Sequence, residues 1–172
     1  MQIQGDKLDS IEQELVQLTG VQPPRAVLTA LLALVDPDDH VASWADWHPN
    51  PNTDWRVWFV TDASLAFLHL EFAEMGWHRG EEESQYGREQ FVASETHAAW
   101  VRPLDTVTEI QVIGYGNPLG DHRQELPLHG LVLKFADGGT AQLPTQEAMY
   151  PQHRAGIDRL IEAIRERVAF WG

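Results

Sequence analysis

The last third of the chain constrains the fold most, because two strand-like runs meet there at a tight-turn signal. Every second residue is apolar over 131–135 and again over 141–143, and Pro144 ends the alternation. Between the runs, Asp137-Gly138-Gly139 supplies residues that tolerate positive φ. The pattern predicts a β-hairpin formed by strands near 129–136 and 140–144.

A helical period follows this hairpin. The apolar residues that recur at helical spacing are Ile157, Leu160, Ile161, Ile164 and Val168. This stripe predicts one amphipathic helix over 153–169, with its apolar side against the sheet. The chain is therefore expected to end as a sheet capped by a helix.

The first part of the chain is helical in pattern and changes to a period of two near residue 40. Residues 7–18 and 24–35 predict two helices, the second opened by prolines and almost wholly apolar. Further strands are expected at 40–48, 55–61, 64–73, 96–102 and 107–115. We expect a mobile acidic loop at 74–95 and a second loop at 116–128. We expect residues 1–38 to form a helical pair packed on the β domain of residues 39–172.

Seven strands followed by one helix is the order of the pleckstrin-homology-like (PH-like) fold, and local motifs agree. The segments Val60-Thr61-Asp62-Ala63-Ser64-Leu65, Pro103-Leu104-Asp105-Thr106-Val107 and Leu133-Lys134-Phe135-Ala136-Asp137 resemble those of bacterial PH-like and GRAM-like domains over residues 40–170. The resemblance implies an α+β fold with a partly open barrel of about seven antiparallel strands. It also implies a non-catalytic binding module. Such domains often carry a basic residue where this chain has Ser64, so lipid-headgroup binding is not expected.

The tryptophans predict a strand register. Four of the seven flank the loop at 48–54, two on each side. A hairpin centred on Pro51 places Trp47 opposite Trp55 and Trp44 opposite Trp58, with Asp46 opposite Arg56 between them. Cross-strand pairs of this kind stabilise a sheet by about 0.2–1 kcal/mol each.

Parity then assigns the two faces of the sheet, with Trp55, Val57 and Phe59 on the face expected to be core. Trp44, Trp58 and Phe67 fall in one row on the outer face, flanked by Arg56 and His69. We take these five residues as the candidate binding site, because aromatic side chains beside arginine are enriched in contact surfaces. Two alternatives stay open: the N-terminal helices cover the row, or a partner or second copy does.

Charge and composition limit the possible partners. The formal net charge of −14 makes nucleic acid and anionic membranes poor partners and favours a basic protein. The absence of cysteine excludes disulfides and thiolate catalysis and fits a cytoplasmic protein. No basic segment precedes an apolar run at the N-terminus, so no signal peptide is expected.

Catalytic and cofactor motifs are absent from the sequence. There is no Gly-x-Ser-x-Gly, phosphate loop or dinucleotide fingerprint. The pairs Asp46/His48 and His69/Glu71 offer metal ligands by type, but without a characteristic spacing. We therefore expect no metal or cofactor and a protein-binding or self-associating module. The alternatives are an acidic immunity or antitoxin-type protein that neutralises a basic toxin, and a metal-dependent enzyme.

Overall fold

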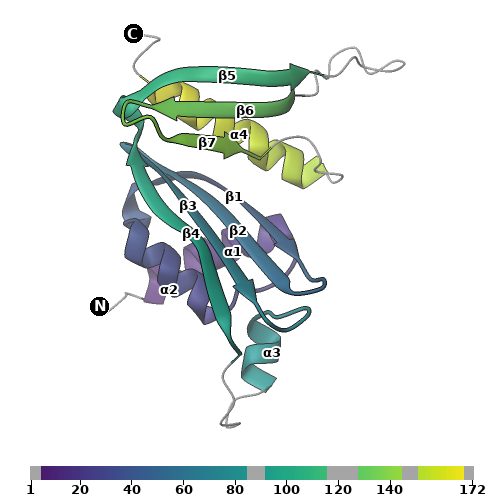
Figure 1. The fold of residues 1–172 in the computed structure, drawn as a ribbon. Helices are drawn as coiled ribbons and strands as arrows, with labels where there is room; N and C mark the ends of the chain where they lie inside the picture. Colours follow the sequence, from purple (N-terminus) through teal and green to yellow (C-terminus); the bar gives the residue numbers. More distant parts are fainter. Residues whose placement is uncertain (1–4, 85–91, 116–127, 145–150, 169–172) are drawn as a thin grey trace.

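The computed structural model describes residues 5–84, 92–115, 128–144 and 151–168. Within them, two antiparallel sheets and several helices form an α+β fold, a partly open barrel (Figure 1). Sheet A has the order β1-β2-β3-β4, with β1 (His40–His48), β2 (Thr53–Thr61), β3 (Ser64–Phe72) and β4 (Ser94–Pro103). Sheet B has the order β5-β6-β7, with β5 (Val107–Tyr115), β6 (Leu128–Phe135) and β7 (Thr140–Leu143).

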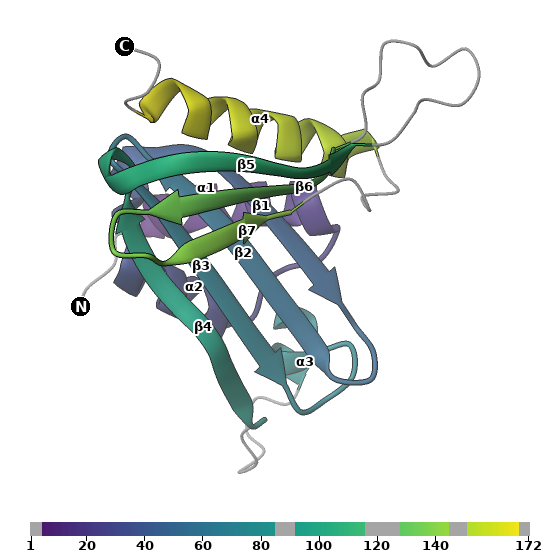
Figure 2. The same ribbon diagram turned by 45° about the horizontal axis from the view of Figure 1, so that its top comes forward.

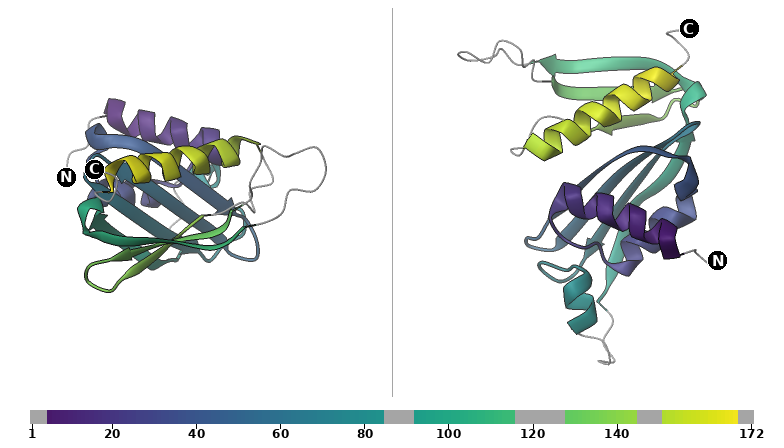
Figure 3. Two further views of the ribbon diagram at one scale, coloured as in Figure 1. Left: turned by 90° about the horizontal axis from the view of Figure 1, so that it is seen from above. Right: turned by 180° about the vertical axis from the view of Figure 1, so that it is seen from behind.

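The helices lie on different sides of sheet A. Their bounds are α1 (Gly5–Thr19), α2 (Arg25–Leu34), α3 (Arg79–Ser84) and α4 (Pro151–Arg167), and two short 3-10 helices are η1 (Pro37–Asp39) and η2 (Leu104–Thr106). Both α1 and α2 cover one face of sheet A, as the view from behind shows (Figure 3). We call the opposite face the outer face. No helix over the described residues combines the length and apolarity needed to cross a membrane.

The first core lies between sheet A and the N-terminal helices. Leu15, Leu28 and Leu31 from the helices pack there with Trp55 and Phe59 from β2, all of them buried. Trp55 and Phe59 share the sheet face that parity assigned to the core. This core therefore holds α1 and α2 against sheet A.

The second core joins sheet B and α4 to part of the outer face of sheet A. Sheet B crosses over the strands of sheet A, with α4 beside it (Figure 2). Leu133 and Leu143 from sheet B pack with Leu160 and Ile164 from α4 and with Val60 from β2. The predicted apolar stripe of the C-terminal helix is thus buried, and burial of this kind contributes about 25 cal/mol per Å² of apolar surface.

The predicted registers and turns are confirmed. Trp47 pairs with Trp55, Asp46 with Arg56, and Trp44 with Trp58. In the β6–β7 hairpin, Gly138 adopts a φ of 82°, a left-handed conformation that glycine reaches without strain.

One prediction needs correction: the segment 74–95 is not a loop throughout. Residues 79–84 form α3, which is fixed to the N-terminal helices. The Glu82 carboxylate accepts a hydrogen bond of 3.0 Å from the backbone N–H of Arg25, the first residue of α2. The Arg79 guanidinium lies 3.9 Å from Glu12 of α1. Glu82 thus caps a helix from a distant part of the chain. Residues 85–91 and 116–127, also predicted as loop, lie outside the described residues.

Candidate functional site

The predicted aromatic row exists, but Trp44 and Trp58 are buried and Phe67 is half-buried. Trp58 pairs with Phe67 across β2 and β3, and their rings stack with centroids 4.3 Å apart. Trp100 on β4 completes the row, with its ring 5.7 Å from that of Trp58 in an edge-on arrangement. Only 7% of Trp44 and 5% of Trp58 are exposed. Trp44 and Trp58 therefore belong to the second core, and Phe67 is packed against it.

The cover over this row differs from both predicted alternatives. The N-terminal helices lie on the other face of sheet A. Instead, η2 leads the chain from β4 into sheet B, and sheet B with α4 packs onto the row. The prediction of an exposed row at Trp44 and Trp58 is wrong, because a later part of the same chain supplies the apolar cover.

Arg102 of β4 links sheet A to sheet B beside the aromatic row. Its guanidinium bonds Asp137 in the β6–β7 turn at 2.7 Å and lies 4.7 Å from the centre of the Phe135 ring. The backbone N–H of Gly139 and, next, the Arg102 guanidinium lower the pKa of Asp137 below its ordinary value. These contacts join the edge of sheet A to the hairpin of sheet B.

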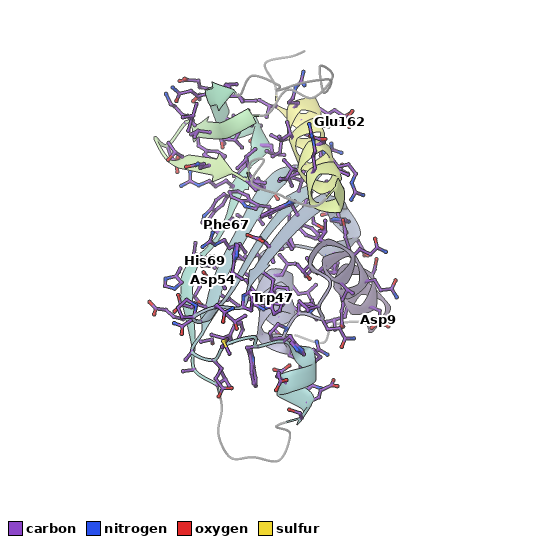
Figure 4. The ribbon with its side chains drawn as sticks, turned by 90° about the vertical axis from the view of Figure 1, so that its right-hand side faces the viewer. Asp9, Trp47, Asp54, Phe67, His69 and Glu162 are labelled. Atoms are coloured by element: carbon purple, nitrogen blue, oxygen red, sulfur yellow. The ribbon has the colours of Figure 1, made fainter. Side chains whose placement is uncertain are left out.

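We call the part of the outer face under sheet B and α4 the covered half. The same strands continue beyond it into a polar half. Its side chains are those of Asp46, His48, Asp54, Arg56, His69, Glu71, Glu95 and His97. Figure 4 shows Phe67, His69 and Asp54 in succession along this side of the sheet, away from Asp9 on α1. Arg56 and His69, two of the predicted binding residues, lie in the polar half.

Asp54 bonds two other side chains at the centre of the polar half. One carboxylate oxygen lies 2.8 Å from Nε2 of His69, and the other lies 3.3 Å from the Arg56 guanidinium. The Arg56 side chain is 42% exposed, whereas those of Asp54 and His69 are about half as exposed. Asp54 thus holds an imidazole and a guanidinium together at the surface.

A second carboxylate–imidazole pair lies beside the first. Nε2 of His97 is 3.1 Å from a carboxylate oxygen of Glu71, and the His97 ring lies 4.7 Å from the His69 ring. The amide of Asn52 donates to the other oxygen of Glu71. A third pair joins His48 to Asp46 on β1. Each of the three histidines is therefore bonded to one carboxylate.

Three members of the polar half were missed from the sequence: Asp54, Glu95 and His97. Glu95 was placed in the loop at 74–95, whereas β4 begins at Ser94. Asp54 was assigned to the loop because β2 was expected to begin at Trp55, whereas it begins at Thr53. The spacing of two residues between Asp54 and Arg56 could have placed Asp54 on this face, because alternate residues of a strand share a face. His97 enters through a register shift between β3 and β4 next to His69, where an extra residue is accommodated. No feature of the sequence marks that shift.

The hydrogen bonds and ligand groups of the polar half bear on two kinds of chemistry, hydroxyl activation and metal binding. Within the described residues, the hydrogen bonds of His69 and His97 run to carboxylates, so no hydroxyl nucleophile is activated there. The nearby Thr53 hydroxyl is buried and donates to the Glu74 carbonyl at 2.6 Å. The described part of the chain contains no group of three or more His, Asp or Glu side chains placed to hold a metal ion.

His40 lies in a different environment from the histidines of the polar half. Its ring packs against Phe59 at 4.5 Å, and Nε2 lies 3.1 Å from Glu14 of α1. Burial lowers the pKa of His40, the negative charge of Glu14 opposes this, and the Arg159 guanidinium adds to the lowering. His40 therefore belongs to the packing between β1, α1 and α4, away from the polar half.

Comparison with known protein families, with curated proteins and with solved structures found no match to this chain. The resemblance to PH-like and GRAM-like domains therefore stays a prediction. Any argument about function starts from the geometry of the two halves.

Proposed function

We propose that the protein is a non-catalytic, PH-like binding module whose polar half contacts a basic segment of a protein partner. One observation carries the proposal: the chain covers the apolar half of the outer face with its own sheet and helix and leaves the charged half at the surface. With neutral histidines, four carboxylates against one guanidinium leave this half at a formal charge of −3. Charge complementarity therefore favours lysine and arginine side chains.

The geometry suits recognition of such side chains. The carboxylates of Asp54 and Glu71 are held by hydrogen bonds to His69, Arg56, His97 and Asn52, so their positions are set before a partner arrives. Preorganised acceptors lose less conformational entropy on binding than freely rotating ones. Guanidinium groups bind carboxylates with two parallel hydrogen bonds, which adds direction to the attraction.

The negative charge disfavours a second copy of the chain, an anionic membrane or a nucleic acid as the partner at this surface. Two copies of a chain with a net charge of −14 would bring like charges together at this face, which opposes self-association. Anionic membranes and nucleic acids are repelled for the same reason. A protein that neutralises a basic toxin remains the special case in which the basic partner is a toxin, and blocking of toxin activity would identify it.

The test is a binding measurement with defined probes. A panel of short fluorescent peptides rich in lysine and arginine is titrated with the protein, and peptides rich in glutamate serve as controls. We expect binding of at least one basic peptide, weakened by added salt because the attraction is electrostatic. In the double variant Asp54→Asn/Glu71→Gln, affinity for that peptide should fall by about tenfold, or 1.4 kcal/mol.

A matched variant separates the polar half from general acidity. Asp9→Asn/Glu162→Gln removes the same charge from exposed positions on α1 and α4, away from the polar half (Figure 4). This control should bind like the parent. Equal weakening in both double variants, or no binding of any basic peptide, would contradict the proposal. Concentration-dependent self-association lost in the polar-half variant would assign the surface to a second copy instead.

A further inference from the structure

We infer that the polar half binds its basic partner in a pH-dependent way, because three histidines on the same surface cancel its negative charge when they become protonated. The inference rests on the proposed function and adds its regulation. It is carried by the placement of His48, His69 and His97, each bonded to a carboxylate of the surface that would contact the partner.

The charge count gives the size of the effect. Four carboxylates and one guanidinium set the polar half at −3 while its histidines are neutral. Three imidazolium groups bring the same surface to a formal charge of zero. Histidine is the side chain whose charge ordinarily changes between about pH 5 and 8. The attraction for lysine and arginine is therefore strongest above this range and weakest below it.

Charged and titratable side chains from β2, β3 and β4 surround His69. Asp54 and Arg56 face it from β2, and the His97 ring faces it from β4 at 4.7 Å. Glu71 lies two residues further along its own strand. A proton on His69 therefore places positive charge beside both carboxylates that the proposal assigns to the partner.

His48 and His97 extend this arrangement to the two edge strands of sheet A, β1 and β4. His97 faces Glu71 from β4 and lies 3.9 Å from Glu95 on its own strand. His48 bonds Asp46 on its own strand and pairs with Asp54 across β1 and β2. Every carboxylate of the polar half thus lies near at least one histidine, so protonation competes with a basic partner for the same oxygens.

The competition has a structural basis beyond net charge. An imidazolium that donates to a carboxylate oxygen adds an ion-pair attraction to the hydrogen bond, which a neutral imidazole does not supply. A lysine or arginine from a partner would have to displace that bond. Acidification is therefore expected to weaken binding through both the surface charge and the occupied acceptors.

The test is the pH dependence of affinity for the basic peptide that binds best to the parent. Dissociation constants are measured between about pH 8 and pH 5.5 at constant ionic strength. We expect the parent to lose about tenfold or more in affinity over this range. The variant His48→Gln/His69→Gln/His97→Gln keeps hydrogen-bonding side chains that do not titrate, and its affinity should stay nearly constant. Thermal unfolding at each pH verifies that both proteins are folded.

The control variant is His78→Gln, because His78 lies outside the polar half and bonds the backbone N–H of Gly80. It should keep the pH dependence of the parent. Parent affinity that is unchanged between the two pH values, or a triple variant that keeps the full dependence, would overturn the inference while leaving the proposed function intact. Absence of peptide binding at the higher pH would overturn the proposed function and this inference with it.

Discussion

The two halves of the outer face of sheet A are built on the same strands but differ in what covers them. On β2, Trp58 is buried against Phe67 and sheet B, whereas Arg56, two residues earlier on the same face, is 42% exposed. On β3, Phe67 packs against the second core, whereas His69, two residues later on the same face, bonds Asp54 in the polar half. A change of two residues along a strand therefore separates core from surface.

This difference shows that the burial of side chains can change along a single face of a sheet. Alternation fixes which side chains share a face. It leaves open how far a neighbouring layer reaches along that face. Here sheet B and α4 end their contact between Phe67 and His69, and the sequence changes there from aromatic to charged residues. The covered half is part of the second core, and the polar half lies at the surface, where we propose that it binds a partner.

The largest expected effect comes from removing a ring of the covered half. Trp58→Ala should lower the free energy of unfolding by about 3–5 kcal/mol, because it leaves a cavity beside Phe67 and Trp100. Urea unfolding followed by circular dichroism measures the change. The matched variant is Arg56→Ala, on the same strand and face, which should cost no more than about 1 kcal/mol. Similar losses in both variants would abolish the distinction between the halves.

A smaller effect concerns the pH dependence of stability, which we assign to His40. Burial lowers its pKa in the folded protein, so the unfolded chain binds a proton at higher pH than the folded chain does. Stability is therefore complete above the ordinary histidine pKa of about 6.5 and declines as the pH falls below it. His40→Gln should reduce this decline, as measured by urea unfolding at successive pH values.

A neighbouring variant should act in the opposite direction. The Glu14 carboxylate raises the pKa of His40 and so limits its shift. Glu14→Gln should therefore make the loss of stability at acidic pH steeper than in the parent. If His40→Gln leaves the pH dependence unchanged, the acid sensitivity of folding does not originate in this buried histidine.

The smallest expected effect comes from the polar half. His97→Gln removes a surface pair with Glu71 and should change the free energy of unfolding by less than about 1 kcal/mol, because solvent-exposed ion pairs contribute little. Thermal unfolding at neutral pH measures this. A loss comparable to that of Trp58→Ala would mean that the polar half is part of the folding core and would weaken its assignment to binding.

Much of the fold could be predicted because local patterns determine it. The Trp47–Trp55 and Trp44–Trp58 pairs follow from the loop length and parity, and Gly138 follows from the turn chemistry. Parity also assigned Trp55 correctly to the core face. These features depend on residues close together in the sequence.

The candidate site was only partly predictable, because it depends on distant parts of the chain. The cover over Trp58 comes from residues more than seventy positions later, such as Leu133. His97 reaches Glu71 through a register shift that no residue pattern marks. Arg56 and His69 were placed on the correct face, and their binding role stays a prediction.

Hydroxyl-radical footprinting of the native protein, with and without the basic peptide, tests the division into two halves most directly. Reaction rates in the native protein are compared with those of the unfolded chain. We predict that Trp58 is protected as strongly as the fully buried Trp55, while His97 reacts readily, as exposed Met75 does. Added peptide should protect His97 and leave Trp58 unchanged. A Trp58 as reactive as Met75, or protection by the peptide at Trp58 and not at His97, would contradict the account.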